Sequence, residues 1–291
     1  MELGKIRALS SYPPLSQNDF SWVPNLIAQL PRDIEGRRRE RKGLKWVTFD
    51  DLTQVPGQII RETDELIGLG ENSRASRFRS AFLIQWLVTL PWRQRNIREC
   101  KLMSFADGGN LSKEEIPTHS TMAIPPWVQE ALKANPREKF WQFCFRPRET
   151  KTSHLVRAIV PRQLVSPLED YIKLYRPSLV NGPDPGTLFL NDHGGSYRQG
   201  SIGAPLGNVT FRYTGRRVNP HLFRDIFAVQ WLEEHPEDYL TLSKILWHRN
   251  IQTTIRIYGA GFDESHGARR IEQWLDSRIR ACGRTASLQP A

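Results

Sequence analysis

The sequence predicts a mixed α/β fold that is mainly helical and contains one small antiparallel hairpin. Three observations predict it. Most segments after residue 70 carry apolar residues at helical spacing, one pair of short segments alternates like strands, and no internal repeat is present. The chain has 291 residues, enough for about two domains, and its hydrophobic fraction of 39% is sufficient for a packed core.

The first 45 residues are predicted to be irregular, because prolines interrupt them and they end in a dense basic run. The prolines are Pro13, Pro14, Pro24 and Pro31, and the run consists of Arg37, Arg38, Arg39, Arg41, Lys42 and Lys45. Such a run is either a solvated charged loop or an arm that follows a DNA backbone. A marginal helix, GQIIRETDELIGLG, follows and ends at glycine. We expect a domain boundary near residue 70.

A buried helix and a hairpin are predicted next. The segment SRASRFRSAFLIQWLVTL is apolar over most of its length and stops at Pro91. The segment KFWQFCF, residues 139–145, alternates like a strand, and RPRETKTS is a polar turn. The segment HLVRAIVP, residues 154–161, completes the hairpin. A short amphipathic helix, PLEDYIKLY, is expected to end before Pro177, and GTLFLND is expected to be extended.

Four helices are predicted in the last third of the chain. The first, VNPHLFRDIFAVQWLEEH, has a clear start, because Asn219 can cap it and Pro220 suits the first turn. The others are DYLTLSKILW, IQTTIRIY and ESHGARRIEQWLDSRI. In the last of these, one helical stripe contains Ala268, Ile271, Trp274, Leu275 and Ile279.

Charge and cysteine content restrict the classes of function. A net charge of +10 favours a polyanionic partner, with nucleic acid the leading candidate, although a merely basic protein has the same balance. Cys100, Cys144 and Cys282 lie far apart and form no CxxC or Cys/His pattern, so we expect neither a disulfide framework nor a zinc site. The apolar run of residues 81–92 is too short to span a bilayer, and residues 1–17 lack the apolar core of a signal peptide. We expect a cytoplasmic protein without membrane contact.

Several residues suit phosphate chemistry, yet each alone has an ordinary explanation. Tyr258 follows His248 by ten residues and could be a half-buried packing residue. His221 and Arg224 share one face at a helix N-terminus, where anions bind, but a capping histidine and a surface arginine would look the same. Arg93 could interact with the dipole of the helix it follows, and Lys151 could be a turn lysine.

The order Arg93, Lys151, His221, Arg224, His248, Tyr258 resembles the catalytic set of the tyrosine recombinases, also called the phage-integrase family. The resembling segments lie within about residues 75–262 and are PWRQRNIRECKL, RETKTSHLVRAIVP, TLFLNDHGGS, VNPHLFRDIFAVQWL and ILWHRNIQTTIRIYGAG. Each segment is weak by itself, whereas six positions matched in order are specific. The resemblance implies a DNA-cleaving and rejoining domain with Tyr258 as the nucleophile.

The resemblance also implies a role for each residue. Arg93 and Arg224 would clamp the scissile phosphate with forked hydrogen bonds, and His248 would donate a further one. His221 would assist proton removal from Tyr258, and Lys151 would protonate the leaving 5′-oxygen. The product is a 3′-phosphotyrosine. No cofactor and no metal are implied, because arginines supply the charge that Mg²⁺ supplies in two-metal enzymes.

The sequence departs from the family at several positions. Asp225 stands where a second histidine is usual, Trp247 where a glycine is usual, and Pro91-Trp92 where a small flexible pair commonly precedes the first arginine. Lys151 is the least specific match, with Lys101 a distant rival. Members of the family also carry a helical core-binding domain before the catalytic one, and about 70 residues are available here.

The expected organisation has three parts: a basic arm or reduced core-binding region at 1–70, a tyrosine recombinase catalytic domain at 71–262, and a C-terminal helix and tail at 263–291. The expected function is site-specific recombination of a mobile element by integration, excision or transposition. The alternatives are a type IB topoisomerase-like enzyme that relaxes or resolves DNA, and a DNA-binding remnant or regulator that does not cut. The expected partners are double-stranded DNA in the nucleoid and further copies of the chain, as a tetramer on paired sites.

The basic run gives the first testable prediction. Replacing Arg37, Arg38, Arg39 and Arg41 with glutamine should flatten the slope of log affinity against log salt by up to about four units, if each arginine pairs with one phosphate. DNA binding measured across a salt series checks this. An unchanged slope would identify the run as a solvated loop.

Overall fold

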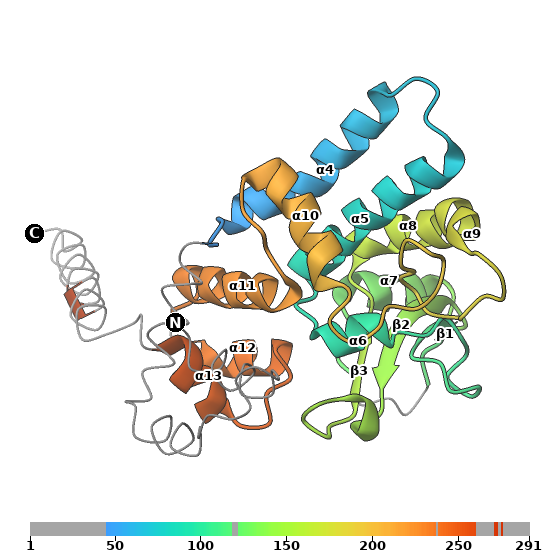
Figure 1. The fold of residues 1–291 in the computed structure, drawn as a ribbon. Coiled ribbons are helices and arrows are strands. Elements are labelled where there is room, and N and C mark those ends of the chain that lie inside the picture. The colour runs from blue at the N-terminus through green and yellow to red at the C-terminus, as the bar shows by residue number, and fades with distance from the viewer. Residues whose placement is uncertain (1–44, 118–121, 237, 260–270, 273–274, 276–291) are drawn as a thin grey trace, which may run out of the picture. The chain divides into compact units, whose positions relative to one another are not determined.

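The computed structural model describes residues 45–117, 122–236, 238–259, 271, 272 and 275 (Figure 1). Contacts divide the chain into two units, Met1–Lys45 and Trp46–Ala291, and the second contains the elements below. The predicted basic run lies outside the described residues, as does most of the predicted helix at 264–279, of which Ile271 and Leu275 are described and exposed. Over these ranges, no helix has the length and apolar content that crossing a membrane requires.

Helices predominate, and one small sheet accompanies them. The longer helices are α4 (Phe49–Glu65), α5 (Glu71–Thr89), α10 (Gly203–Thr214) and α11 (Pro220–Glu234). The shorter helical elements are α6 (Gln94–Arg98), α7 (Pro126–Ala134), η2 (Pro147–Glu149), α8 (Arg162–Asp170), η3 (Tyr171–Tyr175), α9 (Arg176–Leu179), α12 (Tyr239–Ile245) and α13 (Ile251–Tyr258). The strands are β1 (Leu111–Glu115), β2 (Lys139–Phe145) and β3 (Val156–Ile159). The predicted mainly helical fold with a small antiparallel sheet is confirmed.

Helix α5 is the central element of the core, and its prediction as a buried helix is confirmed. Phe82, Trp86 and Leu87 are fully or almost fully buried. The helix packs against α4, α8, η3, α9, α10 and α11. It ends at Thr89, because Pro91 restricts the residue before it and offers no N–H for a further turn. Helix α5 therefore ends four residues before Arg93.

Helix α4 begins earlier than the sequence predicted. Thr48 caps it by accepting a hydrogen bond of 3.1 Å from the backbone N–H of Asp51. Pro56 lies inside the helix, which is why a start at Gly57 was expected. Burial of Leu52 and Ile59 in the core offsets the proline, because α4 packs on α5, α10 and α11. The domain boundary near residue 70 stays a prediction.

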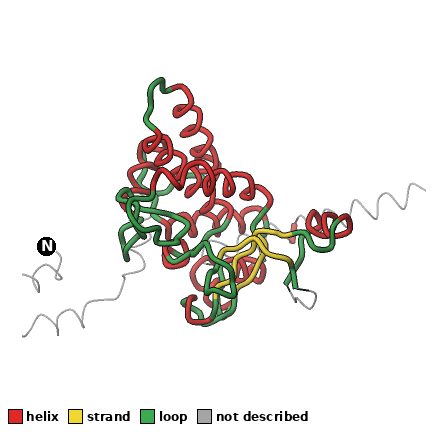
Figure 2. Tube along the Cα trace, turned by 90° about the vertical axis from the view of Figure 1, so that its right-hand side faces the viewer, coloured by secondary structure: helices red, strands yellow, loops and turns green. Residues whose placement is uncertain are grey.

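The sheet has the order β1-β2-β3, with both pairs antiparallel, and Figure 2 shows its strands in yellow among the more numerous helices. The hairpin of β2 and β3 was predicted and pairs Phe143 with Ala158. On its other edge β2 pairs with β1, which was not predicted, placing Leu111 opposite Phe143. The sequence of β1 is LSKEE, in which Leu111 alone is buried, so it carries little apolar alternation.

The helix expected to end before Pro177 continues to Leu179, so that prediction was wrong. After α8 the chain passes through one π-helical turn, η3, into α9. Pro177 lies in the first turn of α9, where a missing N–H costs little. Arg176 is buried here and donates to both carboxylate oxygens of Asp184 and to the carbonyl of Thr187. This ion pair holds α9 against the extended segment after it.

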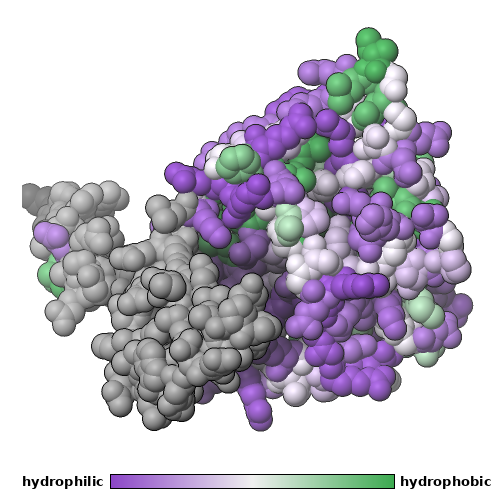
Figure 3. Space-filling model, viewed as in Figure 1, coloured by the Kyte–Doolittle hydropathy of each residue, from purple (hydrophilic) through white to green (hydrophobic). Residues whose placement is uncertain are grey.

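In one view, the described part of the surface is mostly hydrophilic, and one of its apolar patches lies at the turn between α4 and α5 (Figure 3). Leu66 is 40% exposed and Ile67 is fully exposed at this turn. Two apolar residues form a smaller patch than those that mark interfaces between proteins.

An aromatic cluster joins the sheet to the segments on either side of it. It contains Trp92, Phe143, Phe145 and Trp247, and Trp92 lies 5.0 Å from each phenylalanine ring, centroid to centroid. Trp247 lies 5.8 Å from both Trp92 and Phe145. Its backbone has a φ of +51°, a left-handed conformation that glycine adopts far more readily than residues with a Cβ. The contacts of its ring therefore hold the backbone of Trp247 in a conformation that is unfavourable for a residue with a Cβ.

Trp247 gives the second testable prediction, in the form of a matched pair. Trp247→Ala and Trp247→Gly both lose the ring contacts, so both should unfold more easily than the unmodified chain. Glycine also relieves the left-handed backbone, so Trp247→Gly should be about 1 kcal/mol more stable than Trp247→Ala. Urea denaturation measures the difference. An alanine variant as stable as the glycine variant would show that the backbone at residue 247 is unstrained.

Candidate active site

Arg224 is placed by a well-defined helix start, as the sequence predicted. The side chain of Asn219 accepts hydrogen bonds of 3.0 Å from the backbone N–H groups of His221 and Leu222, and Pro220 occupies the first turn of α11. Arg224 lies one turn further and is 3% exposed. Its Nη1 donates to the carbonyl of Pro91 at 2.7 Å, and its Nη2 donates to the carbonyl of Leu246. The guanidinium thus joins α11 to two distant segments of the chain.

Arg93 lies two residues after Pro91 and precedes the first turn of α6. Its Nη1 atom is buried and has no hydrogen-bond partner among the residues that the structure describes. Burial lowers the pKa of Arg93, and the nearby Tyr258 partly opposes that shift. A buried guanidinium donor without an acceptor is costly, and an anionic ligand would satisfy it.

His248 is positioned by the end of α12. The N–H of Trp247 donates to the carbonyl of Lys244, and the N–H of His248 donates to that of Ser243. These two bonds form a Schellman motif, in which residue 247 must be left-handed. Glycine adopts this conformation more readily than any residue with a Cβ. Here Trp247 adopts it, and His248 follows directly.

The ring of His248 is neutral at physiological pH. Its Nδ1 lies 2.9 Å from the hydroxyl of Thr254, which is fully buried in α13. Burial lowers the pKa of His248 to about 4, and the charges of Arg224 and Arg93 add to the shift. When the Thr254 hydroxyl donates to Nδ1, the ring proton lies on Nε2, which can then donate to an anion.

Tyr258, the last residue of α13, contacts a carboxylate rather than a histidine. Its hydroxyl donates to Oδ1 of Asp225 at 3.0 Å, and Asp225 is 3% exposed. Burial raises the pKa of Tyr258, and the negative charge of Asp225 raises it further, while Arg224 and Arg93 oppose the shift. Asp225 was noted in the sequence only as a departure from the family pattern. The sequence feature that could have identified Asp225 as a site residue is its position directly after Arg224.

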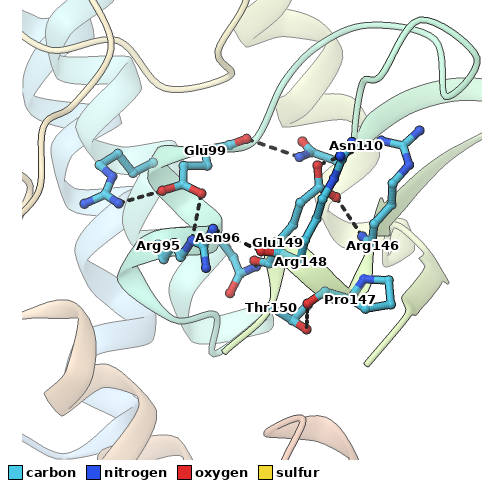
Figure 4. A network of polar contacts seen from close by, with 10 residues as sticks. Arg95, Asn96, Glu99, Asn110, Arg146, Pro147, Arg148, Glu149 and Thr150 are labelled. Atoms are coloured by element: carbon cyan, nitrogen blue, oxygen red, sulfur yellow. Dashed lines mark hydrogen bonds and ion pairs between the residues drawn. The ribbon is translucent and has the colours of Figure 1, made fainter. Parts of the chain in front are cut away.

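Lys151 is exposed in the turn between η2 and β3, and a polar network fixes the base of that turn to α6 (Figure 4). The side chain of Arg95 donates to the carbonyl of Arg148 at 3.1 Å, and that of Asn96 donates to the carbonyl of Glu149 at 3.3 Å. The hydroxyl of Thr150 donates to the carbonyl of His154 at 2.9 Å and closes the turn. The segment that carries Lys151 is therefore tied to the helix that Arg93 precedes.

The predicted residues divide into two groups. Contacts and charge interactions bring Arg93, Arg224, His248 and Tyr258 together. Lys151 and His221 are exposed, the first on a turn and the second in the first turn of α11. Throughout the described ranges, no group of three or more His, Cys, Asp or Glu side chains is arranged to hold a metal ion.

The central group has the chemistry of an anion site with a hydroxyl at its edge. Burial lowers the pKa of Arg224 to about 10, so the guanidinium stays protonated at neutral pH. Two cationic guanidiniums act on one phenol, to which Asp225 is hydrogen-bonded, and the same guanidiniums act on the neutral imidazole of His248. Such a site can hold a phosphodiester and place a nucleophile against it.

Comparison with known proteins finds similarity to solved structures only, at low sequence identity. No family model matches the sequence, and no curated protein matches it. Among solved structures, XerH site-specific recombinase bound to palindromic difH substrate in a post-cleavage complex is 15% identical, with a TM-score of 0.48, over 78% of this chain and 52% of that chain. The pre-cleavage XerH–difH complex is 14% identical, with a TM-score of 0.47 and the same coverage. XerA recombinase is 15% identical, with a TM-score of 0.47, over 78% of this chain and 64% of that chain.

The chain thus spans about half the length of the XerH chains and less than two thirds of the XerA chain. At these identities and scores, its activity has to be argued from its own residues.

His248 gives the third testable prediction. Because its pKa is about 4 in the folded chain and about 6.5 in an unfolded one, the unfolded chain binds more protons between these values. The free energy of unfolding should therefore fall as pH is lowered from about 6.5 to about 4. His248→Gln should lose part of this dependence, whereas His193→Gln, at an exposed position, should keep it. Urea denaturation at several pH values measures it, and identical pH dependence in both variants would contradict the prediction.

Proposed function

We propose that the chain is a tyrosine-type site-specific DNA recombinase. It cleaves and rejoins DNA through a 3′-phosphotyrosine intermediate during integration, excision or transposition of a mobile element. One observation carries the proposal: the hydroxyl of Tyr258 is hydrogen-bonded to a buried carboxylate and lies under the influence of Arg93 and Arg224. An ordinary packing tyrosine needs neither guanidinium.

The two arginines bind the scissile phosphate in this proposal. A phosphodiester is anionic and resists attack, so the transition state needs added positive charge. Arg93 has a buried donor available for it. Arg224 uses two of the five N–H donors of a guanidinium on backbone carbonyls, which fixes the plane of the group. His248 contributes a further hydrogen bond to the phosphate.

Lys151 protonates the leaving 5′-oxygen. The turn that carries it is tied to α6 through Arg95 and Asn96, so it stays beside the segment of Arg93. Its exposed side chain is long enough to follow the leaving group. The guanidiniums supply the charge that Mg²⁺ supplies in two-metal enzymes, so the scheme includes no metal and no cofactor.

The remaining parts of the proposal rest on the sequence. The basic run of residues 37–42 binds the DNA backbone as part of an arm at 1–70, and the catalytic domain extends to about residue 262. The partners are double-stranded DNA in the nucleoid and three further copies of the chain on paired sites. The tail at 263–291 contributes to that assembly.

One observation favours a second candidate, a DNA-binding protein that does not cut. Asp225 raises the pKa of Tyr258 and so opposes formation of a phenolate. A type IB topoisomerase-like enzyme is the third candidate, and it would relax supercoiled DNA without paired sites. The adduct experiment below separates the second candidate, since a non-cutting protein forms no adduct. Incubation with a supercoiled plasmid that lacks paired sites separates the third, since a relaxing enzyme changes its supercoiling.

Tyr258 gives the fourth testable prediction. On a pool of nicked duplexes of randomised sequence, the unmodified chain should form a covalent adduct that resists denaturation. Tyr258→Phe should abolish the adduct and leave DNA affinity nearly unchanged, because it removes only the attacking oxygen. Denaturing gels detect the adduct, and sequencing of the bound DNA identifies the site. Tyr239→Phe is a matched control, because Tyr239 packs in the same cluster as Tyr258. An adduct in Tyr258→Phe would refute the nucleophile.

A further inference from the structure

The contact between Tyr258 and Asp225 does not follow from the family pattern and is held by packing. Asp225 lies in α11 and Tyr258 at the end of α13, and their oxygens are 3.0 Å apart. Tyr258 packs against a buried cluster formed by Ala228, Leu232, Leu242 and Leu246. Helices α11 and α13 both contact α12, which fixes the carboxylate and the phenol relative to each other.

Asp225 is within reach of the proton that cleavage must remove. An ionised carboxylate only accepts hydrogen bonds, so the Tyr258 hydroxyl must be the donor. A general base has to lie within about 2.6–3.2 Å of the atom that it deprotonates, and Asp225 meets this condition without any rearrangement. His221 is exposed in the first turn of α11, four residues before Asp225 on the same helix face.

The charges around the contact favour proton transfer during attack rather than before it. A phenolate beside an ionised carboxylate is disfavoured, and the raised pKa of Tyr258 reflects this. If the proton moves to the carboxylate as the oxygen attacks, the negative charge of Asp225 disappears while charge builds on the phosphoryl group. The attraction of the two guanidiniums is then no longer divided between this carboxylate and the phosphoryl group.

We propose that Asp225 accepts the proton of Tyr258 during DNA cleavage and returns it during rejoining. In cleavage, the bond from Oη of Tyr258 to phosphorus forms and the bond from phosphorus to the 5′-oxygen breaks. The Tyr258 proton passes to Asp225, and the leaving 5′-oxygen takes a proton from Lys151. The total charge is unchanged, and rejoining reverses each transfer. This inference rests on the proposed recombinase function and assigns to Asp225 the step that the family resemblance gives to His221.

The test measures single-turnover cleavage on the nicked duplex recovered from the randomised pool. Asp225→Asn keeps the size and an acceptor oxygen but cannot take a proton, so it should slow cleavage by about 100-fold or more. DNA affinity should hardly change. Asp192→Asn is the matched control, because Asp192 also pairs with a buried arginine, Arg79, away from Tyr258. His221→Ala should slow cleavage far less than Asp225→Asn.

A second substrate separates the role of Asp225 as proton acceptor from the role of Lys151 as general acid. When sulfur replaces the bridging 5′-oxygen, the leaving group departs without needing a proton. Lys151→Ala should then regain most of its lost rate, whereas Asp225→Asn should stay slow, because removal of the Tyr258 proton is still required. Recovery of Asp225→Asn on this substrate would overturn the proposal.

A third experiment replaces the carboxylate of Asp225 with the imidazole of a histidine. Asp225→His should cleave faster than Asp225→Asn, and its rate should decline as pH falls below about 6.5, the ordinary pKa of histidine. The unmodified chain is measured over the same pH range as the reference. Among the described residues, Arg224 and Tyr258 interact with Asp225, and Arg93 and Arg224 also act on Tyr258. His221 lies four residues earlier on α11, and His248, between α12 and α13, is affected by the same two arginines. If Asp225→His has the same pH profile as the unmodified chain, the proposal is wrong. This comparison tests the proposal even if Asp225→Asn fails to fold.

Two outcomes separate this inference from the function on which it rests. If the unmodified chain forms no adduct on any nicked duplex, the recombinase proposal fails and the role of Asp225 fails with it. If the unmodified chain forms an adduct and Asp225→Asn forms it equally fast, only the role of Asp225 is wrong.

Discussion

The guanidinium of Arg224 is almost completely removed from water and donates to the backbone carbonyls of Pro91 and Leu246. Each carbonyl lies two residues before a side chain of the candidate site, Arg93 in one segment and His248 in the other. Burying a cation costs several kcal/mol unless acceptors surround it, and these carbonyls and Asp225 offset that cost. Arg224 thereby fixes the segments that carry Arg93 and His248 relative to α11.

Two of the departures from the family pattern, Trp247 and Asp225, have structural roles in this arrangement. The Schellman motif after α12 requires a left-handed residue, and Trp247 fills that position at the expense of backbone strain while its ring completes the cluster around Trp92. Asp225 places a carboxylate against the Tyr258 hydroxyl. The first change stabilises the segment that carries His248, and the second alters the proton chemistry available to Tyr258.

The sequence predicts those parts of the fold that local physics determines. The caps at Asn219 and Pro220, the apolar helix α5 and the hairpin of β2 and β3 each follow from a few adjacent residues. The edge strand β1 was missed because its sequence is polar, and α10 because GAPLGNVTFRYT contains two glycines and a proline. The extent of α4 was missed because tertiary packing outweighs Pro56.

The sequence likewise predicts some parts of the candidate site and not others. Order and residue type along the chain predicted Arg93, Arg224, His248 and Tyr258, which interact in the structure. The pairing of Asp225 with Tyr258 spans 33 residues and depends on how α11 and α13 pack against α12. No pattern within either helix contains that information. The buried, unpartnered donor of Arg93 likewise emerges only when the segments are assembled.

The central claim is that the buried guanidinium of Arg224 clamps the phosphate in the transition state, and Arg224→Lys tests it most directly. Lysine keeps the charge and loses the fork. Cleavage rate and DNA affinity are measured together, with Arg176→Lys as a control at another buried arginine that binds a backbone carbonyl. The account predicts a cleavage rate lower by about 100-fold or more, a much smaller loss of affinity, and little change of either quantity in folded Arg176→Lys. Equal losses of rate and affinity in Arg224→Lys would contradict the claim and make Arg224 a contact to the DNA backbone.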